Sequence, residues 1–196
     1  MIIQQTLLTV HKGVDLHAAS ARRVMARRLP GGDRLRDLHR AEFHTFWRGN
    51  GEAAGLSVPD LLAQGRYYNP NKHFYLHAEL PEAAPWADAP AEPVLDPRWP
   101  GRVAASDLPG GREPLDRLLG GPPAADETVV DVAAFPLGEA APLLSGVVWR
   151  LRLALRPGDD AAAVAHDLVV ARSRRHGLLV NPWMQGWRLA PARTRE

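Results

Sequence analysis

The chain has 196 residues, a formal net charge of +2 and no cysteine. The lack of cysteine excludes disulfides, cysteine-based zinc sites and thiol catalysis. Hydrophobic residues make up 45% and charged residues 23% of the chain, as in globular proteins with a packed core. Apolar runs are shorter than the roughly 18–20 residues that span a membrane, and the first residues do not resemble a signal peptide. We therefore expect a cytoplasmic protein that does not enter a membrane.

The first half predicts alternating strands and helices. In chain order, the expected elements are a strand over 1–10, a helix over 16–29, a strand over 34–47, a short helix after Ser57 and a strand over 73–80. Asp15 stands where a helix-capping carboxylate is expected, and Pro30-Gly31-Gly32 should end that helix. Residues 81–100 contain six prolines, which predicts a linker.

The second half predicts a similar series. Its expected elements are strands over 101–106, 127–136 and 147–155, helices over 113–119 and 159–175, and a last strand over 178–180 and 183–189. In strand 147–155 the alternation turns Trp149 and Leu151 inward and leaves Arg150 and Arg152 outward. Gly177 fits the residue that follows a helix C-terminus, with Arg172, Arg174, Arg175 and His176 in the last helical turn.

These elements predict an α+β fold of two ferredoxin-like (βαββαβ) modules in tandem, with antiparallel sheets and helices on one face. The first module covers 1–80 and the second 101–196, joined by the linker 81–100. Each sheet would have an open face, and sheet-on-sheet packing could cover it. The aromatic residues available for that packing are Trp47, Tyr75, Trp149, Trp183 and Trp187.

A repeated Asn-Pro element indicates the duplication. Asn69-Pro70 and Asn181-Pro182 each stand before an aromatic-rich segment that should form a strand. Repeats of this kind mark duplicated structural units. We therefore expect each Asn-Pro pair to lie where its half of the chain enters its last strand.

Two segments resemble the small PurS subunit of formylglycinamidine ribonucleotide amidotransferase. Lys12, Gly13, Val14 and Asp15 are similar to the turn after the first strand of that family, and Leu178, Leu179, Asn181 and Pro182 are similar to its Leu-Leu-Ala-Asn-Pro motif before the last strand. The residues after the second Asn-Pro, Trp183 to Trp187, depart from the family, and this chain has about twice the usual length. The resemblance implies a non-catalytic bridging subunit, whose partners are a synthetase and a glutaminase.

The chemistry-bearing residues predict no catalytic centre and no metal or cofactor site. His73 and His77 would lie on one face of a strand but about 13 Å apart, too far to bind one ion. The serines have no Gly-x-Ser-x-Gly turn, and the glycine-rich pieces have no phosphate-loop spacing. A small-molecule pocket near the first Asn-Pro element is an alternative. It would use Tyr68, Asn69, Asn71, Lys72 and His73, whereas Asn181, Trp183 and Trp187 are the expected interface residues.

A nucleic-acid-binding module is the other alternative, because arginines concentrate in the first half. They are Arg22, Arg23, Arg27, Arg28, Arg34, Arg36, Arg40 and Arg48. Solvated helix faces explain them better, since the strands contain no segment with the RNA-binding pattern of glycine and aromatic residues. A homodimer is compatible with either function.

Overall fold

The computed structural model describes residues 3–48, 58–81, 113–137, 143–190 and 192–195. The expected strand 101–106, the capping residue Ser57 and nearly all of the expected linker lie outside the described residues. The strands are β1 (Ile3–His11), β2 (Leu35–Arg48), β3 (His73–Pro81), β4 (Thr128–Pro136), β5 (Leu143–Leu153) and β6 (Gln185–Leu189). The helices are α1 (Leu16–Arg28), α2 (Val58–Ala63), α3 (Glu113–Leu118) and α4 (Ala161–Val169), with a short 3-10 turn at Gly32–Arg34.

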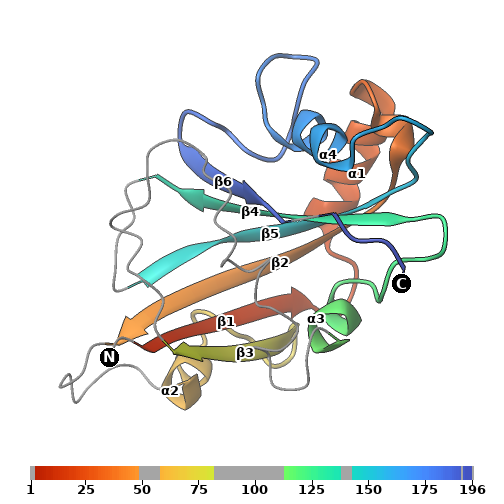
Figure 1. Cartoon of the computed structure of the whole chain (residues 1–196). Helices are drawn as coiled ribbons and strands as arrows, with labels where there is room; N and C mark the ends of the chain where they lie inside the picture. Colours follow the sequence, from red (N-terminus) through yellow and green to blue (C-terminus); the bar gives the residue numbers. More distant parts are fainter. Residues whose placement is uncertain (1–2, 49–57, 82–112, 138–142, 191, 196) are drawn as a thin grey trace.

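All six strands belong to one antiparallel sheet in the order β3-β1-β2-β5-β4-β6. The expected α+β class and antiparallel pairing are therefore confirmed. The two halves meet edge to edge, through pairs that run from Leu35 with Leu153 to Phe46 with Leu143 (Figure 1). The expectation of two sheets packed face to face is wrong. Edge pairing satisfies backbone groups of β2 and β5 that two separate sheets would leave as open edges.

Each half places its three strands in the same spatial order. The first strand of each half, β1 or β4, lies in the middle. The second, β2 or β5, lies at the junction of the halves, and the third, β3 or β6, forms an outer edge of the sheet. The helices differ, because the long helix follows the first strand in one half and the second strand in the other.

Helices α1 and α4 cover one face of the junction and the second half (Figure 1). Trp149 and Leu151 of β5 lie in that core, as expected, with Met25 of α1 and Leu168 of α4. Local sequence sets where both helices begin. Asp15 Oδ1 accepts from the backbone N–H groups of His17 and Ala18, and Asp160 Oδ1 accepts from Ala163 N. These carboxylates satisfy N–H groups that a helix start leaves unpaired.

The opposite face carries a buried ion cluster. Arg150 is completely buried and donates to both carboxylate oxygens of Asp131, at 2.7 and 2.8 Å, and to Asp116 Oδ1 of α3 at 2.8 Å. Arg193 binds the same two carboxylates from the C-terminal segment. The expectation that Arg150 points to solvent is wrong, because α3 and this segment lie over the second face of the sheet.

Helix α4 ends at Val169, whereas the sequence predicts a helix to residue 175. The segment that follows returns to the helix end, where Leu179 N donates to Val169 O and Ala171 N donates to Val180 O, both at 2.9 Å. Residues 178–180 thus form an isolated parallel bridge through Val170 and Val180 in place of the expected strand. Arg172, Arg174 and Arg175 consequently lie in a loop.

Gly177 permits this return of the chain. Its φ of +71° is in the left-handed region, and a Cβ added there would lie 1.9 Å from the carbonyl carbon of Val170. The glycine is needed for a close backbone approach, eight residues beyond the end of the helix it was expected to follow directly.

Replacing Arg150 with alanine should reduce the free energy of unfolding by about 3 kcal/mol or more, because the buried carboxylates of Asp131 and Asp116 lose their main partner. Arg156→Ala is the control, since its ion pair with Asp33 is exposed and contributes about 0–1 kcal/mol. Urea unfolding monitored by tryptophan fluorescence measures both variants. Equal losses in the two variants would contradict the importance of the buried cluster.

Gly177→Ala should destabilise the protein more than Gly158→Ala. Both glycines have positive φ, so each substitution costs about 1–2 kcal/mol of backbone strain. A methyl group at Gly158 enters open space, whereas at Gly177 it collides with the Val170 backbone. Thermal unfolding of the two variants measures the difference, and a Gly158→Ala protein as unstable as Gly177→Ala would show that steric contact is unimportant.

Candidate functional site

The first Asn-Pro element forms a compact turn that leads into β3. Asn69 Oδ1 accepts from Asn71 N at 2.9 Å, and the Asn69 carbonyl accepts from Lys72 N at 3.0 Å and His73 N at 2.8 Å. Asn69 N in turn donates to His73 Nδ1 at 3.3 Å. The backbone N–H, the carbonyl and the side-chain oxygen of Asn69 are therefore used within the turn.

The second Asn-Pro element repeats this pattern at the start of β6. Asn181 Oδ1 accepts from Trp183 N at 3.1 Å, and its carbonyl accepts from Met184 N at 3.0 Å and Gln185 N at 2.8 Å. Asn181 N donates to Gln185 Oε1 at 2.8 Å, so Gln185 takes the place of His73. The sequence repeat thus corresponds to a repeated structure at the two outer strands of the sheet.

Each turn is also joined to the middle strand of its half in the same way. Lys12 N donates to Lys72 O at 2.8 Å, and Leu137 N donates to Met184 O at 2.9 Å. Lys12 and Leu137 each come directly after a middle strand, β1 or β4. The two turns are therefore equivalent in their tertiary contacts as well as in their internal hydrogen bonds.

Aromatic side chains surround the first turn. The rings of His73 and His11 lie 4.9 Å apart, and those of Tyr68 and Tyr75 lie 5.0 Å apart. Because His73 Nδ1 accepts a backbone hydrogen bond, the neutral ring carries its proton on Nε2. Burial, helped by the nearby His11, lowers the pKa of His73. Of the expected ligand residues, Tyr68 and His73 lie together, whereas Asn71 and Lys72 point to solvent on the turn.

The second turn presents apolar side chains to solvent. Trp183 is 87% exposed and Met184 is 68% exposed. Leu137, which is bonded to the turn through its backbone, is also exposed. Trp187 lies elsewhere, on β6 against the hydrophobic core and beside the ring of His166. Of the expected interface residues, Asn181 shapes the turn and Trp183 is accessible.

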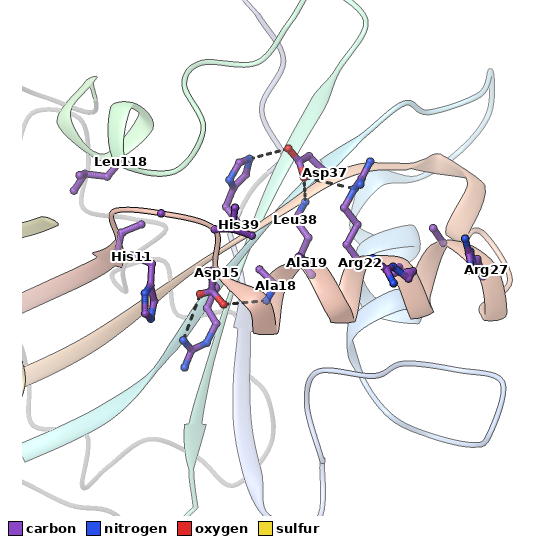
Figure 2. Close-up of a pocket in the computed structure, with 16 residues that line it drawn as sticks. His11, Asp15, Ala18, Ala19, Arg22, Arg27, Asp37, Leu38, His39 and Leu118 are labelled. Atoms are coloured by element: carbon purple, nitrogen blue, oxygen red, sulfur yellow. Dashed lines mark hydrogen bonds and ion pairs between the residues drawn. The ribbon is translucent and has the colours of Figure 1, made fainter. Parts of the chain in front are cut away.

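A separate pocket of about 700 Å³ opens between α1, the start of β2 and α3 (Figure 2). It exists because β1 pairs with β2 only as far as Thr9 with Glu42, so the first part of β2 has no strand beside it on that side. Helix α1 lies there in place of a strand. The pocket also reaches His11, whose ring contacts His73 of the first turn.

Ion pairs join the walls of this pocket. Arg22 of α1 donates to Arg36 O at 2.9 and 2.6 Å and lies 3.5 Å from Asp37. It therefore binds an open carbonyl of the β2 edge. Arg40 lies 3.5 Å from Asp15 and 2.6 Å from Glu42, and its guanidinium lies over the Trp149 ring. Figure 2 shows Asp37 between the side chains of His39 and Arg22.

The chain matches no known family model, no curated protein and no solved structure. The internal repeat and the pocket are thus the observations from which a function can be argued. The described residues contain no group of three or more side chains suited to hold a metal ion. Among the described helices, none is both long and apolar enough to cross a membrane.

His39 lines the pocket, and one of its ring nitrogens has no hydrogen-bond partner. Its Nε2 is buried and lies 3.4 Å from Asp37 Oδ2, but without hydrogen-bond geometry. Its ring packs against Gly120, where any side chain would collide with it. Burial lowers the pKa of His39, while the Asp37 charge opposes that shift. The sequence predicted neither a role for this residue nor the pocket. The pocket depends on where β1 stops pairing with β2, and the position of His39 depends on its contact with Gly120, far along the chain.

His44 is a half-buried histidine on the other face of β2. Its Nδ1 lies 2.9 Å from Ser145 Oγ, and its ring packs on Tyr67 at 4.6 Å. Burial lowers its pKa from 6.5 to about 4. The neutral ring is therefore the form that the fold accommodates.

The basic character of the first half is partly neutralised by the fold. Arg34 Nε binds Asp159 at 2.6 Å across the two halves, while Arg22 and Arg40 have the acidic partners described above. These three arginines are therefore paired with carboxylates and add less free positive charge to a basic surface of the kind that nucleic-acid binding favours.

Protonation of His44 should destabilise the folded protein in acid. The pKa of His44 is about 4 in the folded state and 6.5 ordinarily. Its protonation therefore costs no unfolding free energy above pH 6.5, and the free energy of unfolding falls as the pH drops from 6.5 towards 4. The loss attributable to this one side chain is about 3 kcal/mol at most. His44→Asn, which stays neutral, should show a shallower fall in urea-unfolding free energy between these pH values.

The control is a comparison of the wild type and His44→Asn at pH values higher than about 7. His44 is neutral there in both the folded and the unfolded state, so any difference in unfolding free energy reflects packing alone. If the unfolding free energies of the wild type and His44→Asn fall in parallel with pH, His44 is not a source of the acid destabilisation.

Proposed function

We propose that the protein is a non-catalytic bridging and assembly subunit similar to PurS, which connects a synthetase and a glutaminase subunit of a purine-biosynthesis amidotransferase in the cytoplasm. Such a complex converts formylglycinamide ribonucleotide, ATP and glutamine to the amidine. The observation that carries the proposal is the pair of equivalent turns at opposite edges of one sheet, each with exposed apolar side chains.

Val14, which belongs to one of the segments that resemble PurS, contributes to these exposed surfaces. Val14, between β1 and α1, is 76% exposed, and Phe74, which follows the first turn, is 51% exposed. We call Val14, Leu16 and Phe74 the first patch, and Leu137, Trp183 and Met184 the second patch. Exposed tryptophan, methionine and phenylalanine are enriched where proteins contact each other. Phe74 is on β3, and Trp183 and Met184 come directly before β6, so the two patches include residues at opposite ends of the sheet. This arrangement suits a subunit that binds two partners.

The same observations support a duplicated architecture. Equal strand order in the halves, equal turns and equal turn-to-strand hydrogen bonds are what a tandem duplication would produce. We propose that each half derives from one ferredoxin-like module of the PurS type, and that β2 and β5 pair where two such modules meet.

Co-expression with the synthetase and glutaminase subunits of the same source tests the proposal. A tagged copy of this chain should retain both subunits through affinity purification and gel filtration. Amidotransferase turnover by the two larger subunits should require the chain. Purification of the chain without either subunit, together with turnover that does not depend on it, would overturn the bridging function.

The double variant Trp183→Ala/Met184→Ala should weaken binding of one partner while the other still binds. Truncation of a central tryptophan in an interface costs about 2 kcal/mol or more, which corresponds to roughly a 30-fold weaker affinity. The double variant Val14→Ser/Phe74→Ser should affect the opposite partner. Surface plasmon resonance with each subunit immobilised measures both effects.

Val24→Ala serves as the control, because Val24 is 41% exposed on α1, outside both patches. Wild-type affinities in both double variants would show that the patches are not the contact surfaces.

A further inference from the structure

The face of α1 that borders the pocket combines small and cationic residues. Its pocket-lining side chains recur at intervals of three or four residues, which places them on one face of the helix. They are Ala18, Ala19, Arg22, Arg23, Ala26 and Arg27. The alanines leave space beside the β2 edge, and the arginines supply positive charge along it. Ala18 is also part of the hydrophobic core, whereas the other residues of this face are outside the core cluster.

The pocket has a surplus of positive charge. Its lining contains four arginines, Arg22, Arg23, Arg27 and Arg40, against two carboxylates, Asp15 and Asp37.

Both carboxylates are already engaged. Asp15 caps α1 and lies beside Arg40, and Asp37 accepts from Leu38 N and lies beside Arg22 and His39. These two carboxylates therefore leave Arg23 and Arg27 available to an anionic ligand.

Arg23 and Arg27 are the uncommitted cations of the pocket. In the described part of the chain neither has a hydrogen bond or an ion pair. They are separated by four residues, so their guanidinium groups leave the helix from neighbouring turns. Two adjacent, unpaired guanidinium groups can each bind phosphate oxygens through two parallel hydrogen bonds.

We propose that this pocket binds a phosphorylated small metabolite of about nucleotide size, with Arg23 and Arg27 as the phosphate ligands. A volume of about 700 Å³ suits such a ligand, because small-molecule sites are typically about 300–1,000 Å³. Val10, Val14 and Leu118 add an apolar part of the lining that can contact a base or sugar ring. This site goes beyond the bridging function: its lining shares Val14 with the first patch, whereas Arg23 and Arg27 lie outside both patches.

Thermal shift and isothermal titration with ADP, ribose 5-phosphate and inorganic phosphate test the site, with adenosine as the uncharged probe. Phosphorylated probes should raise the melting temperature of the wild-type protein, because a ligand that binds only the native state stabilises it. Adenosine alone should bind much more weakly. Inorganic phosphate that binds as tightly as ADP would show that the apolar lining is not part of the site.

Two variants and one matched control locate the binding. Arg23→Gln/Arg27→Gln should weaken ADP binding about tenfold or more, because hydrogen bonds to a charged phosphate are lost. Arg28→Gln removes a charge from the same helix but outside the pocket, so it should bind ADP like the wild type. Ala19→Phe leaves the charge unchanged and fills the pocket, and it should also lose binding.

Three results would overturn the proposal. In the first, none of the phosphorylated probes raises the melting temperature at millimolar concentration. In the second, Arg28→Gln weakens binding as much as the double variant, or Ala19→Phe binds normally, which would indicate diffuse attraction to the surface. In the third, single-stranded RNA binds tightly while ADP does not, and the arginines then serve a nucleic-acid surface.

Discussion

The pairing of β2 with β5 is the contact on which the rest of the structure depends. It joins two three-stranded halves into one sheet, with pairs that extend from Leu35 with Leu153 to Phe46 with Leu143. It also brings α1 and α4, which come from different halves, onto one shared core. Because each half contributes its second strand to the junction, the third strands and their Asn-Pro turns are placed at opposite edges.

Much of the fold follows from local sequence. The remaining parts depend on contacts between residues that are far apart in the chain. Strand alternation, the caps at Asp15 and Asp160 and the repeated Asn-Pro turn are encoded within a few residues, so they could be predicted. The burial of Arg150 could not, because an arginine in an alternating strand resembles a solvent-facing residue until α3 and its Asp116 are placed over it. The early end of α4 likewise depends on Val180, which returns from eleven residues further along the chain.

The candidate sites divide in the same way. The turns were visible in the sequence because Asn-Pro occurs twice in matching contexts. Trp183 is exposed, and its interface role stays a prediction. The pocket was not visible, because it depends on a difference in length between two neighbouring strands. Residues that line it, such as His39 and Arg23, are ordinary members of a strand and a helix until β1 ends and α1 takes its place.

Because the two turns have matching backbones, one chain presents two surfaces of the same shape with different side chains. The two turns keep one backbone but carry different residues, with Lys72 and His73 in one and Met184 and Gln185 in the other. Two identical subunits related by a twofold axis would display the same chemistry twice. Both turns of this protein belong to one chain, so that restriction does not apply: the residues at equivalent positions can differ while the shared sheet holds the two turns at its opposite edges.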